Sequence, residues 1–348
     1  MKILLLPKYF PEGASSRYRT HNYIDYFIKN GHEVTIKPLF YDGYVKNLYQ
    51  KKSKDYPRIL SDILNRAKHL LKNKSKYDII IIEKELFPYF PYIFERILLQ
   101  NSRYTLDYDD AVSTKYKGGI IKKVLGDKIN NLSENALATA VGNRWYWEEI
   151  TKGNLVYLPT VVDLNKYPIK GIKKPVNYIP IISWIGSPST VKYIYRIKSV
   201  LVELIKVCQF KLRVIGGNID IEGLNIECLP WCEDKEFEHL FSSDIGIMPL
   251  HETPWEYGKC GFKCIQYMAS GLPVVASALP ANEEIIIHGE TGFIAKDDNE
   301  WYEYLKLLLT EPNKRISYGG KARMRVEKNY SYQVWGSKYI EHIENLSI

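Results

Sequence analysis

The sequence contains no run of about 18 apolar residues, the length that a helix needs to cross a bilayer. Its apolar amino-terminal core, Ile3–Leu6, is shorter than that of a secretory signal and ends at Pro7 and Lys8. Internal repeats, low-complexity tracts and the signatures of nucleic-acid-binding modules are also missing. We therefore expect neither a membrane-spanning nor an exported chain, and we expect no nucleic-acid partner.

Cysteine is scarce and is confined to the second half of the chain. The five cysteines do not form the dense framework that disulfides stabilise in small secreted domains, which favours a reducing compartment and hence the cytoplasm. Three residues separate the members of each close pair, whereas the usual zinc knuckle has about two. A zinc site is therefore the weaker interpretation, and we expect no metal. The cysteines are Cys208, Cys228, Cys232, Cys260 and Cys264.

Charge is distributed unevenly along the chain, whose net charge is +8. Residues 1–160 hold 19 Lys and 7 Arg against 9 Asp and 8 Glu, a net charge of +9, so the remainder is close to neutral. Within the first half, residues 58–72 predict a basic amphipathic helix. Such a helix docks on an anionic membrane surface, or it packs its apolar stripe on its own domain. The stripe comprises Ile59, Leu60, Ile63, Leu64, Ala67, Leu70 and Leu71, and the basic residues off it are Arg58, Arg66, Lys68 and Lys72.

Short apolar runs alternate with helical or loop segments, which predicts an α/β protein with doubly wound sheets. A length of 348 residues, 45% of them apolar, is enough for two such domains. Four prolines in Pro159–Pro180 mark the connection, so we expect domains at 1–165 and 175–329 and a last helix at 330–348. The first unit begins with strand, loop and a helix at 16–30. Strands are expected at 2–6, 33–37, 78–82, 104–107, 137–141, 181–186, 211–215, 225–229, 244–250 and 274–276.

The segment 244–292 carries the strongest functional signal. A buried strand leads into a basic loop at 251–259 and a helix at 260–270, and loops at the carboxyl ends of parallel strands are where such sheets bind ligands. Lys259 and Lys263 in the first helical turn would add two cations to the positive end of the helix. The segment therefore predicts a metal-free site for a diphosphate.

The block Met268–Val275 and the later Glu284, in an expected loop up to Gly292, resemble the donor-binding half of a known family. The family is that of the retaining GT-B glycosyltransferases, family 4-like, described as glycosyl transferases group 1. The resemblance implies two Rossmann-like domains that face a cleft, with a C-terminal helix that crosses back to the first domain. It implies a hexosyltransferase of the surface-polysaccharide branch, acting in lipopolysaccharide or capsule synthesis. The donor would be a UDP- or GDP-sugar, with no other cofactor.

Two positions depart from the family pattern. The resemblance places a pair of glutamates at the positions that hold Gly258 and Gln266 in this chain. Gln266 keeps a carbonyl acceptor and adds an amide donor, so it remains able to bind ribose hydroxyls. Glu256 is either a stand-in for the lost first glutamate or an exposed loop carboxylate. The segment resembles a variant, active site of the family and not an inactive one.

Further donor-site positions follow from the resemblance. The family has an Arg and a Lys on the donor diphosphate at the positions of Ser187 and Lys192, and a lysine of the donor helix would replace the missing Arg. Ser187, followed by proline, also predicts the start of a helix. Gly216 allows a nucleotide to approach the main chain. Trp231 lies against the base in this comparison, or it is an ordinary core tryptophan.

The loop after the first strand, with Gly13 and Arg17, corresponds in the family to a glycine-containing loop that faces the cleft. The resemblance makes Gly13 a candidate beside the donor phosphate and Arg17 a candidate for acceptor binding. A simple helix-start charge is the alternative for Arg17. Glu83, Lys84 and Glu85 follow another strand and are expected to join the same cleft, with Glu85 near the acceptor.

An acidic cluster formed by Asp107, Asp109 and Asp110 follows a buried strand. It resembles the Asp-x-Asp manganese motif of the other large glycosyltransferase fold, or it forms an acceptor-side cluster of the first GT-B domain. The lysine-rich donor segment favours the second interpretation, because the diphosphate then needs no metal. We expect Asp109 or Asp110 to orient the acceptor hydroxyl, with Asp107 beside them. The structural alternative is a helix cap with ion pairs to Lys84 or Lys115.

These residues and the resemblance predict a metal-independent, retaining transfer of sugar to a hydroxyl of a surface glycan or lipid-linked saccharide. The candidates for catalysis are Asp109, Asp110, Lys192 and Lys263, because positioning and charge stabilisation carry such a reaction. Two rivals share the fold. One is a nucleotide-sugar epimerase, and the other is a catalytically degenerate partner protein, suggested by the two lost glutamates. The expected location is the cytoplasm, including the inner face of the membrane.

Overall fold

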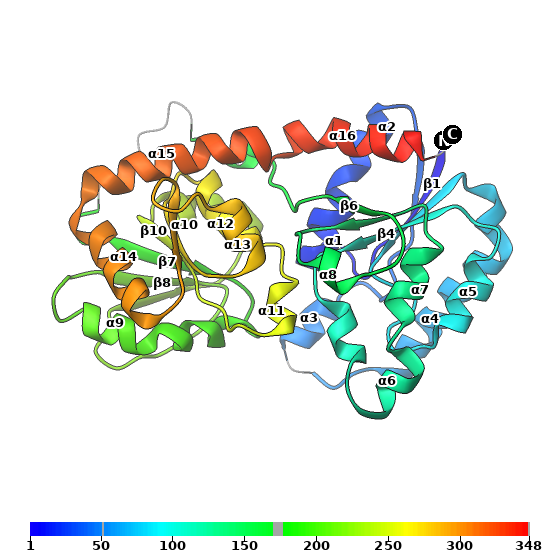
Figure 1. Ribbon diagram of the computed structural model, residues 1–348, viewed down its shortest axis with the longest axis horizontal. Coiled ribbons are helices and arrows are strands. Elements are labelled where there is room, and N and C mark those ends of the chain that lie inside the picture. Colours follow the sequence, from blue (N-terminus) through cyan, green and yellow to red (C-terminus); the bar gives the residue numbers. More distant parts are fainter. Residues whose placement is uncertain (51, 170–176, 347–348) are drawn as a thin grey trace. The chain divides into compact units, whose positions relative to one another are not determined.

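The computed structural model describes residues 1–50, 52–169 and 177–346, and the chain divides into two compact units. Figure 1 shows a sheet with helices packed against it in each unit, which confirms the predicted α/β class. The predicted domain start at 175 and the last two residues of the predicted helix at 330–348 lie outside the described residues. Unit 1 comprises Met1–Thr160, Tyr257–Cys260 and Gly336–Ile348, and unit 2 comprises Val161–Glu256 and Gly261–Trp335.

The strands of unit 1 are β1 (Lys2–Leu6), β2 (Glu33–Ile36), β3 (Ile79–Glu83), β4 (Tyr104–Tyr108), β5 (Ala138–Val141) and β6 (Leu155–Tyr157). They form one parallel sheet in the order β2-β1-β3-β4-β5-β6. The central strands β3 and β4 are buried along their whole length, which explains the run of four isoleucines in β3. Because the strands are parallel, the residues that follow β1, β3 and β4 emerge at one edge of the sheet.

The helices of unit 1 connect these strands. The single helix predicted at 16–30 is wrong, because Thr20 leaves the helical conformation at φ −128° and ψ −61° and divides the segment into three pieces. The elements are α1 (Ala14–Arg19), η1 (His21–Tyr23), α2 (Ile24–Lys29), α3 (Tyr44–Tyr49), α4 (Tyr56–Asn73), η2 (Lys74–Lys76), α5 (Tyr92–Leu99), η3 (Val112–Tyr116), α6 (Gly119–Leu125), α7 (Lys128–Glu134) and α8 (Tyr146–Glu149), where η marks a 3₁₀ helix.

Helix α4 confirms the helix predicted at 58–72. The predicted exposure of one of its basic residues is wrong. Arg66 is buried and not part of a solvated basic face. Its guanidinium donates hydrogen bonds to the carbonyl oxygens of Pro7 at 2.6 Å and Lys37 at 2.8 Å. Arg66 therefore ties α4 to the loops that follow β1 and β2.

The strands of unit 2 are β7 (Ile181–Ile185), β8 (Lys211–Ile215), β9 (Ile226–Leu229), β10 (Ile245–Met248), β11 (Val274–Ser277) and β12 (Gly292–Ala295). They form a second parallel sheet in the order β12-β11-β10-β7-β8-β9. Its core includes the fully buried side chains of Trp184 and Trp301. The carboxyl ends of β7, β8 and β10 again share one edge, where the sequence predicts the donor site.

The helices of the second half are η4 (Leu164–Lys166), η5 (Val191–Ile197), α9 (Lys198–Leu204), α10 (Glu233–Phe241), α11 (Pro254–Tyr257), α12 (Phe262–Ala269), α13 (Pro280–Ile285), α14 (Asp298–Thr310), α15 (Pro312–Asn329) and α16 (Tyr332–Asn345). Helix α12 ends before Gly271, which has a φ of +71°, as the sequence predicts. The predicted loop at 251–259 contains the short helix α11.

Helix α16 confirms the predicted C-terminal helix that returns to the first domain, because its residues from Gly336 onward belong to unit 1. The ring centroid of Tyr339 lies 4.8 Å from that of Tyr23 and 5.8 Å from that of Phe27. These edge-on aromatic contacts anchor the helix on unit 1. Across the described part of the chain, no helix combines the length and apolarity that crossing a membrane requires.

Candidate functional site

Glycine backbone lines the carboxyl edge of the sheet in unit 2. Gly186 follows β7 and Gly216 follows β8. A Cβ atom on Gly216 would lie 2.1 Å from the carbonyl oxygen of Gly186, and the φ of Gly216 is +85°, so no side chain fits there. The backbone conformation and close packing therefore require glycine at 216, and its role beside a nucleotide stays a prediction.

Lys263 reaches the same edge from the N-terminal end of α12. A Cβ atom on Gly186 would lie 2.9 Å from Cε of Lys263, and the ammonium nitrogen of Lys263 lies 4.9 Å from the ring centroid of Trp184. Because an indole face attracts a cation, Trp184 holds the ammonium group near the end of β7. Lys259, which was expected in the same helical turn, precedes the helix and belongs to unit 1, so that prediction is wrong.

Ser187 does not begin a helix, contrary to the prediction. Its backbone N–H donates to Oγ1 of Thr190 at 3.1 Å, and the N–H of Thr190 donates to the carbonyl oxygen of Ser187 at 2.9 Å, which closes a tight turn. The 3₁₀ helix η5 starts only at Val191. Lys192 therefore lies in this 3₁₀ helix, is exposed, and has its ammonium nitrogen 5.9 Å from the ring centroid of Tyr193.

Glu256 is buried in α11, so its interpretation as an exposed loop carboxylate is wrong. The carboxylate accepts hydrogen bonds from the hydroxyls of Tyr193 and Thr253. These contacts connect α11 to η5, the element that carries Lys192. The role of Glu256 as a stand-in for the family's first glutamate stays a prediction.

A carboxylate that sequence reasoning missed organises the neighbouring region. Glu236 on α10 is buried; one of its oxygens accepts from the hydroxyl of Tyr167 at 2.6 Å and from Nε2 of Gln266 at 2.7 Å. The other oxygen accepts from Nε1 of Trp231 at 2.7 Å. The available signal was the position of Glu236 four residues before the buried Leu240, on the buried face of α10.

The Glu236 carboxylate fixes the orientation of two predicted donor-site residues. Trp231 is 38% exposed, so its interpretation as a core tryptophan is wrong. A Cβ atom on Gly216 would lie 3.1 Å from Cβ of Trp231, which places the indole beside the glycine edge. Gln266 is buried and donates an amide hydrogen to Glu236, and its role in binding a ribose hydroxyl stays a prediction.

Glu284 lies in α13, where the sequence predicted a loop. Its backbone carbonyl oxygen accepts hydrogen bonds from Nη2 of Arg325 at 2.7 Å and from the hydroxyl of Tyr330 at 3.2 Å. These bonds tie the end of α13 to α15 and to the residue that follows it. The role of the Glu284 carboxylate in donor binding stays a prediction.

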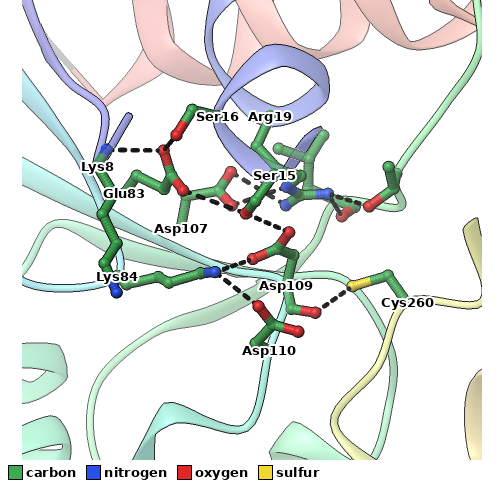
Figure 2. A network of polar contacts seen from close by, with 12 residues as sticks. Lys8, Ser15, Ser16, Arg19, Glu83, Lys84, Asp107, Asp109, Asp110 and Cys260 are labelled. Carbon is green, nitrogen blue, oxygen red and sulfur yellow. Dashed lines mark hydrogen bonds and ion pairs between the residues drawn. The ribbon is translucent and has the colours of Figure 1, made fainter. Parts of the chain in front are cut away.

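Charged side chains crowd the carboxyl edge of the sheet in unit 1, as Figure 2 shows. Lys84 follows β3 with a φ of +66°, and its ammonium nitrogen lies 2.9 Å from Oδ1 of Asp109 and 2.8 Å from Oδ2 of Asp110. The hydroxyl of Ser15 donates to the second oxygen of Asp109 at 2.5 Å. The ion pairs expected as the structural alternative are therefore present, and they fix the two aspartates that are candidates for acceptor binding.

The ionisation of this cluster follows from its neighbours. Burial opposes the charge of Lys84, but Asp109, Asp110 and Glu83 hold its pKa well above the ordinary value. Burial likewise opposes the charge of Asp110, but Lys84 and, more weakly, Lys259 hold its pKa well below the ordinary value. The Asp110 side chain is 31% exposed and that of Asp109 is 13% exposed, so Asp110 is the more accessible carboxylate.

Glu83 anchors the loop between β1 and α1. It accepts hydrogen bonds from the backbone N–H of Lys8 at 3.0 Å and from the hydroxyl of Ser16 at 2.6 Å. Within this loop, a Cβ atom on Gly13 would lie 2.6 Å from Cβ of Tyr9. The glycine is therefore required by close packing, and its proximity to a donor phosphate stays a prediction.

Asp107 forms a buried ion pair and does not reach solvent with the other two aspartates. Nε and Nη2 of Arg19 donate to its two oxygens at 2.8 and 3.0 Å. Burial raises the pKa of Asp107 to about 6, and Arg19 opposes that shift. Both carboxylate oxygens of Asp107 are used by Arg19, so the expectation that Asp107 binds an acceptor is corrected. Arg17 is also buried, with Nη1 3.4 Å from the carbonyl oxygen of Pro11.

Glu85 does not join the charged edge either. It is buried, its oxygens accept from the hydroxyl of Tyr116 at 2.8 Å, and one of them lies 2.6 Å from the ammonium nitrogen of Lys128. Lys128 also pairs with the buried Glu95 at 2.7 Å. The expectation that Glu85 contacts an acceptor is corrected, because its carboxylate is committed to the interior of unit 1.

The segment Tyr257–Cys260 is held within unit 1. Nδ2 of Asn143 donates to the carbonyl oxygens of Tyr257 at 3.0 Å and Lys259 at 2.6 Å. A Cβ atom on Gly258 would lie 2.5 Å from Cβ of Ala111. The glycine at the position of the family's first glutamate therefore has a packing cause, since no side chain fits there.

Metal-ligand clusters are not found in the described residues, where no group of three or more His, Cys, Asp or Glu side chains could hold an ion. Cys228 and Cys232 are exposed, whereas Cys260 and Cys264 are buried. Burial raises the pKa of the thiols of both buried cysteines. The four residues considered as zinc ligands thus occupy different environments.

Comparison with known proteins relates the second half of the chain to one family. Residues 180–311 match the family described as Glycosyl transferases group 1. Trehalose synthase of Pyrococcus horikoshii is 33% identical over 137 residues, which are 39% of this chain and 31% of that protein. The GDP-Man:Man(3)GlcNAc(2)-PP-Dol alpha-1,2-mannosyltransferase of Dictyostelium discoideum is 27% identical over 144 residues, 40% of this chain and 27% of that protein. The matched region thus spans less than a third of each relative's length.

Solved structures match over nearly the whole chain. Sucrose-phosphate synthase from Thermosynechococcus elongatus aligns with a TM-score of 0.74 and 16% identity over 99% of both chains. Anabaena Alr3699/HepE, solved in complex with UDP-glucose, aligns with a TM-score of 0.72 and 15% identity over 99% of this chain and 100% of that chain. At these identities the likeness concerns the fold, and it confirms the predicted GT-B fold, with one Rossmann-like sheet in each unit.

Proposed function

From the match of residues 180–311 to the family described as Glycosyl transferases group 1, we propose that the protein is a glycosyltransferase. It transfers a sugar from a nucleotide diphosphate sugar to a hydroxyl of a surface-glycan or lipid-linked acceptor. The transfer retains the anomeric configuration and needs no metal. Its place of action is the cytoplasm, with the acceptor at the inner face of the membrane.

The observation that carries this proposal is the glycine edge beside Lys263, which lies inside the family-matched region. A pyrophosphate needs close approach to the main chain and a positive charge. Gly186 and Gly216 supply the first, and Lys263 at the start of α12 supplies the second. This pairing of bare backbone and cation suits the diphosphate of a sugar nucleotide.

The nucleoside would lie beside the diphosphate. Trp231 offers an exposed indole face next to Gly216, and Gln266 offers an amide oxygen for a ribose hydroxyl. Two relatives point to the base: Anabaena HepE was solved with UDP-glucose, and the Dictyostelium relative is named for GDP-mannose. A UDP- or GDP-sugar is therefore the proposed donor.

The proposed reaction proceeds on one face of the sugar. The bond between the anomeric carbon and the β-phosphate oxygen breaks, and the acceptor oxygen forms the new bond on the same face. The departing phosphate oxygen takes the acceptor proton, so the protein needs no separate base. Lys263 and the exposed Lys192 stabilise the charge that develops on the diphosphate. Asp110, which is more exposed than Asp109 and shares Lys84 with it, orients the acceptor hydroxyl.

The first test is a thermal-shift screen of the full chain against UDP, GDP, CMP and dTDP, followed by the sugar series of the nucleotide that binds. We expect one base to raise the melting temperature and its sugar nucleotide to be consumed when an acceptor is present. An axial or equatorial assignment of the new bond by NMR then tests retention. Isomerised sugar in the absence of acceptor would instead identify an epimerase, and inversion would overturn the proposed mechanism.

A catalytically degenerate partner protein is the second candidate, because two observations favour it. No glutamate fits at Gly258 beside Ala111, and the amide of Gln266 is bound to Glu236. In that case the donor edge binds nucleotide without turnover. Calorimetric binding of a sugar nucleotide, combined with no release of its nucleoside diphosphate across a panel of lipid-linked acceptors, would select this candidate over the transferase.

A further inference from the structure

Helices α4 and α5 of unit 1 expose large apolar side chains next to lysines, and we propose that this surface docks the protein on an anionic lipid bilayer. We call it the α4–α5 surface, and it consists of Leu60, Leu64, Leu71, Ile93, Phe94 and Ile97. The sequence pattern pointed to one helix and left its apolar stripe ambiguous between bilayer and core. In the structure, part of this stripe packs on the core and part is exposed, and a second helix, α5, also exposes apolar side chains.

The stripe on α4 has two parts with different surroundings. Ile63 and Leu70 pack against the core of unit 1. Leu60, Leu64 and Leu71 are 53%, 59% and 64% exposed, and their spacings of four and seven residues place them along one line of the helix. Packing on the core of unit 1 therefore accounts for the buried residues of the stripe and not for the three exposed leucines.

Helix α5 lies next to α4 and also exposes apolar side chains. The ammonium nitrogen of Lys74, just after α4, donates to the carbonyl oxygens of Leu98 at 2.9 Å and Gln100 at 2.7 Å, which joins the C-terminal ends of the two helices. Figure 1 shows α4 and α5 together in unit 1. The side chains of Ile93, Phe94 and Ile97 on α5 are each about half exposed. Two neighbouring helices thus present apolar groups to solvent.

The charge around this surface is positive. In residues 52–76, all of which are described, the exposed acidic side chain is Asp55 alone. On α5, the acidic residue Glu95 is buried against Lys128, and the exposed charge is Arg96. The exposed basic residues of the α4 region are Lys52, Lys54, Arg58, Lys68, Lys72 and Lys76.

The exposed apolar and basic side chains together indicate which partner binds the α4–α5 surface. Apolar side chains insert at the headgroup boundary while lysine and arginine stems reach up to anionic headgroups, and each basic residue near such a surface adds to the attraction. A second copy of this chain on the same surface would bring two surfaces of like positive charge together, Lys68 and Lys72 among their exposed residues, which is unfavourable. An anionic bilayer satisfies both the apolar and the basic groups.

The test is flotation of the full chain with two kinds of vesicle, one with about 30 mol% phosphatidylglycerol in phosphatidylcholine and one of phosphatidylcholine alone. We expect binding to the anionic vesicles, weaker binding to neutral ones, and loss of binding at high salt. The triple variant Leu60→Gln, Leu64→Gln, Leu71→Gln and the double variant Ile93→Gln, Ile97→Gln should each weaken binding by about tenfold or more.

A matched control uses the same chemical change in unit 2. Ile316 and Met324 on α15 are also exposed, so Ile316→Gln with Met324→Gln should leave vesicle binding unchanged. Unaltered melting temperature and nucleotide-induced shift in the α4 and α5 variants separate this proposal from the proposed activity. Equal binding by wild type and both surface variants would overturn it. So would wild-type dimers in sedimentation velocity that the same variants dissociate, because that outcome assigns the surface to a second copy.

Discussion

The carboxyl edge of the sheet in unit 1 ends in Lys84 and its aspartates, whereas the same edge in unit 2 ends in Gly186 and Gly216. In unit 1 one ammonium group lies within 3 Å of two carboxylates, so carboxylates outnumber cations in this ion-pair cluster. In unit 2 the residues at the edge are glycines, and the ammonium nitrogen of Lys263 lies 4.9 Å from the ring centroid of Trp184. The edge of unit 1 therefore holds carboxylates in fixed positions, and the edge of unit 2 combines glycines with a lysine, which is the combination that the proposed diphosphate site requires.

The largest expected effect is on the stability of unit 1. Replacing Lys84 by Met leaves Asp109 and Asp110 without their shared cation in a mostly buried place, so the free energy of unfolding should fall by about 3–5 kcal/mol. Urea unfolding of full-length protein measures this change. Lys321→Met, at an exposed site on α15, is the control and should stay within about 0.5 kcal/mol of wild type. Similar values for the two variants would contradict a structural role for the charged edge.

The next effect concerns the donor edge. Lys263→Ala should lower turnover by about ten- to a thousandfold, because one partner of the developing diphosphate charge is lost. Lys192→Ala should act in the same direction. Steady-state rates at saturating donor provide the measurement, with Lys321→Ala as the control. Wild-type turnover in both donor-edge variants would remove the assigned diphosphate site.

A smaller effect is expected from Glu236, which positions other groups. Glu236→Gln keeps the shape but weakens the hydrogen bonds to Trp231 and Gln266, so the donor KM should rise about tenfold with kcat less affected. The exposed Glu238 on the same helix offers the control Glu238→Gln. A fall in kcat at constant KM would show that Glu236 acts on the chemical step and not on nucleoside placement.

The smallest effect is a pH dependence of stability. Lys84 depresses the pKa of Asp110 in the folded state, so this carboxylate stabilises the fold above its unfolded-state pKa and loses that contribution as pH falls. The difference in unfolding free energy between wild type and Asp110→Asn should be about 1 kcal/mol at neutral pH and should shrink below about pH 4. A difference that grows on acidification would contradict this sign.

Strand positions were predictable because buried parallel strands leave nearly continuous apolar runs, and the edge residues follow from them. The position of Gly216 directly after β8 was predicted in this way, whereas the position of Lys263 near the start of α12 follows from helical spacing. Burial of polar groups was not predictable, since Arg66 and Glu236 are hidden by contacts with residues far away in sequence. Local signals also misled at Ser187, where Thr190 closes a turn before any helix forms.

The departure at Gly258 shows the same limit. From the sequence it is only a lost glutamate, whereas its cause is the packing of the segment against Ala111, which lies more than a hundred positions earlier. Lys259 was placed with the donor helix because it is close in sequence, yet it belongs to unit 1. Proximity in sequence therefore does not decide which unit holds a residue.

The most direct test of the account asks which edge binds the nucleotide. A photoreactive uridine or guanosine diphosphate sugar, whichever the thermal-shift screen selects, would be irradiated with the full chain and the adduct mapped by mass spectrometry. The account predicts adducts in unit 2, on peptides that contain Gly216–Trp231 or Lys263, which an excess of unlabelled nucleotide suppresses. Competable adducts confined to the peptides of Lys84 and Asp110 in unit 1 would contradict it.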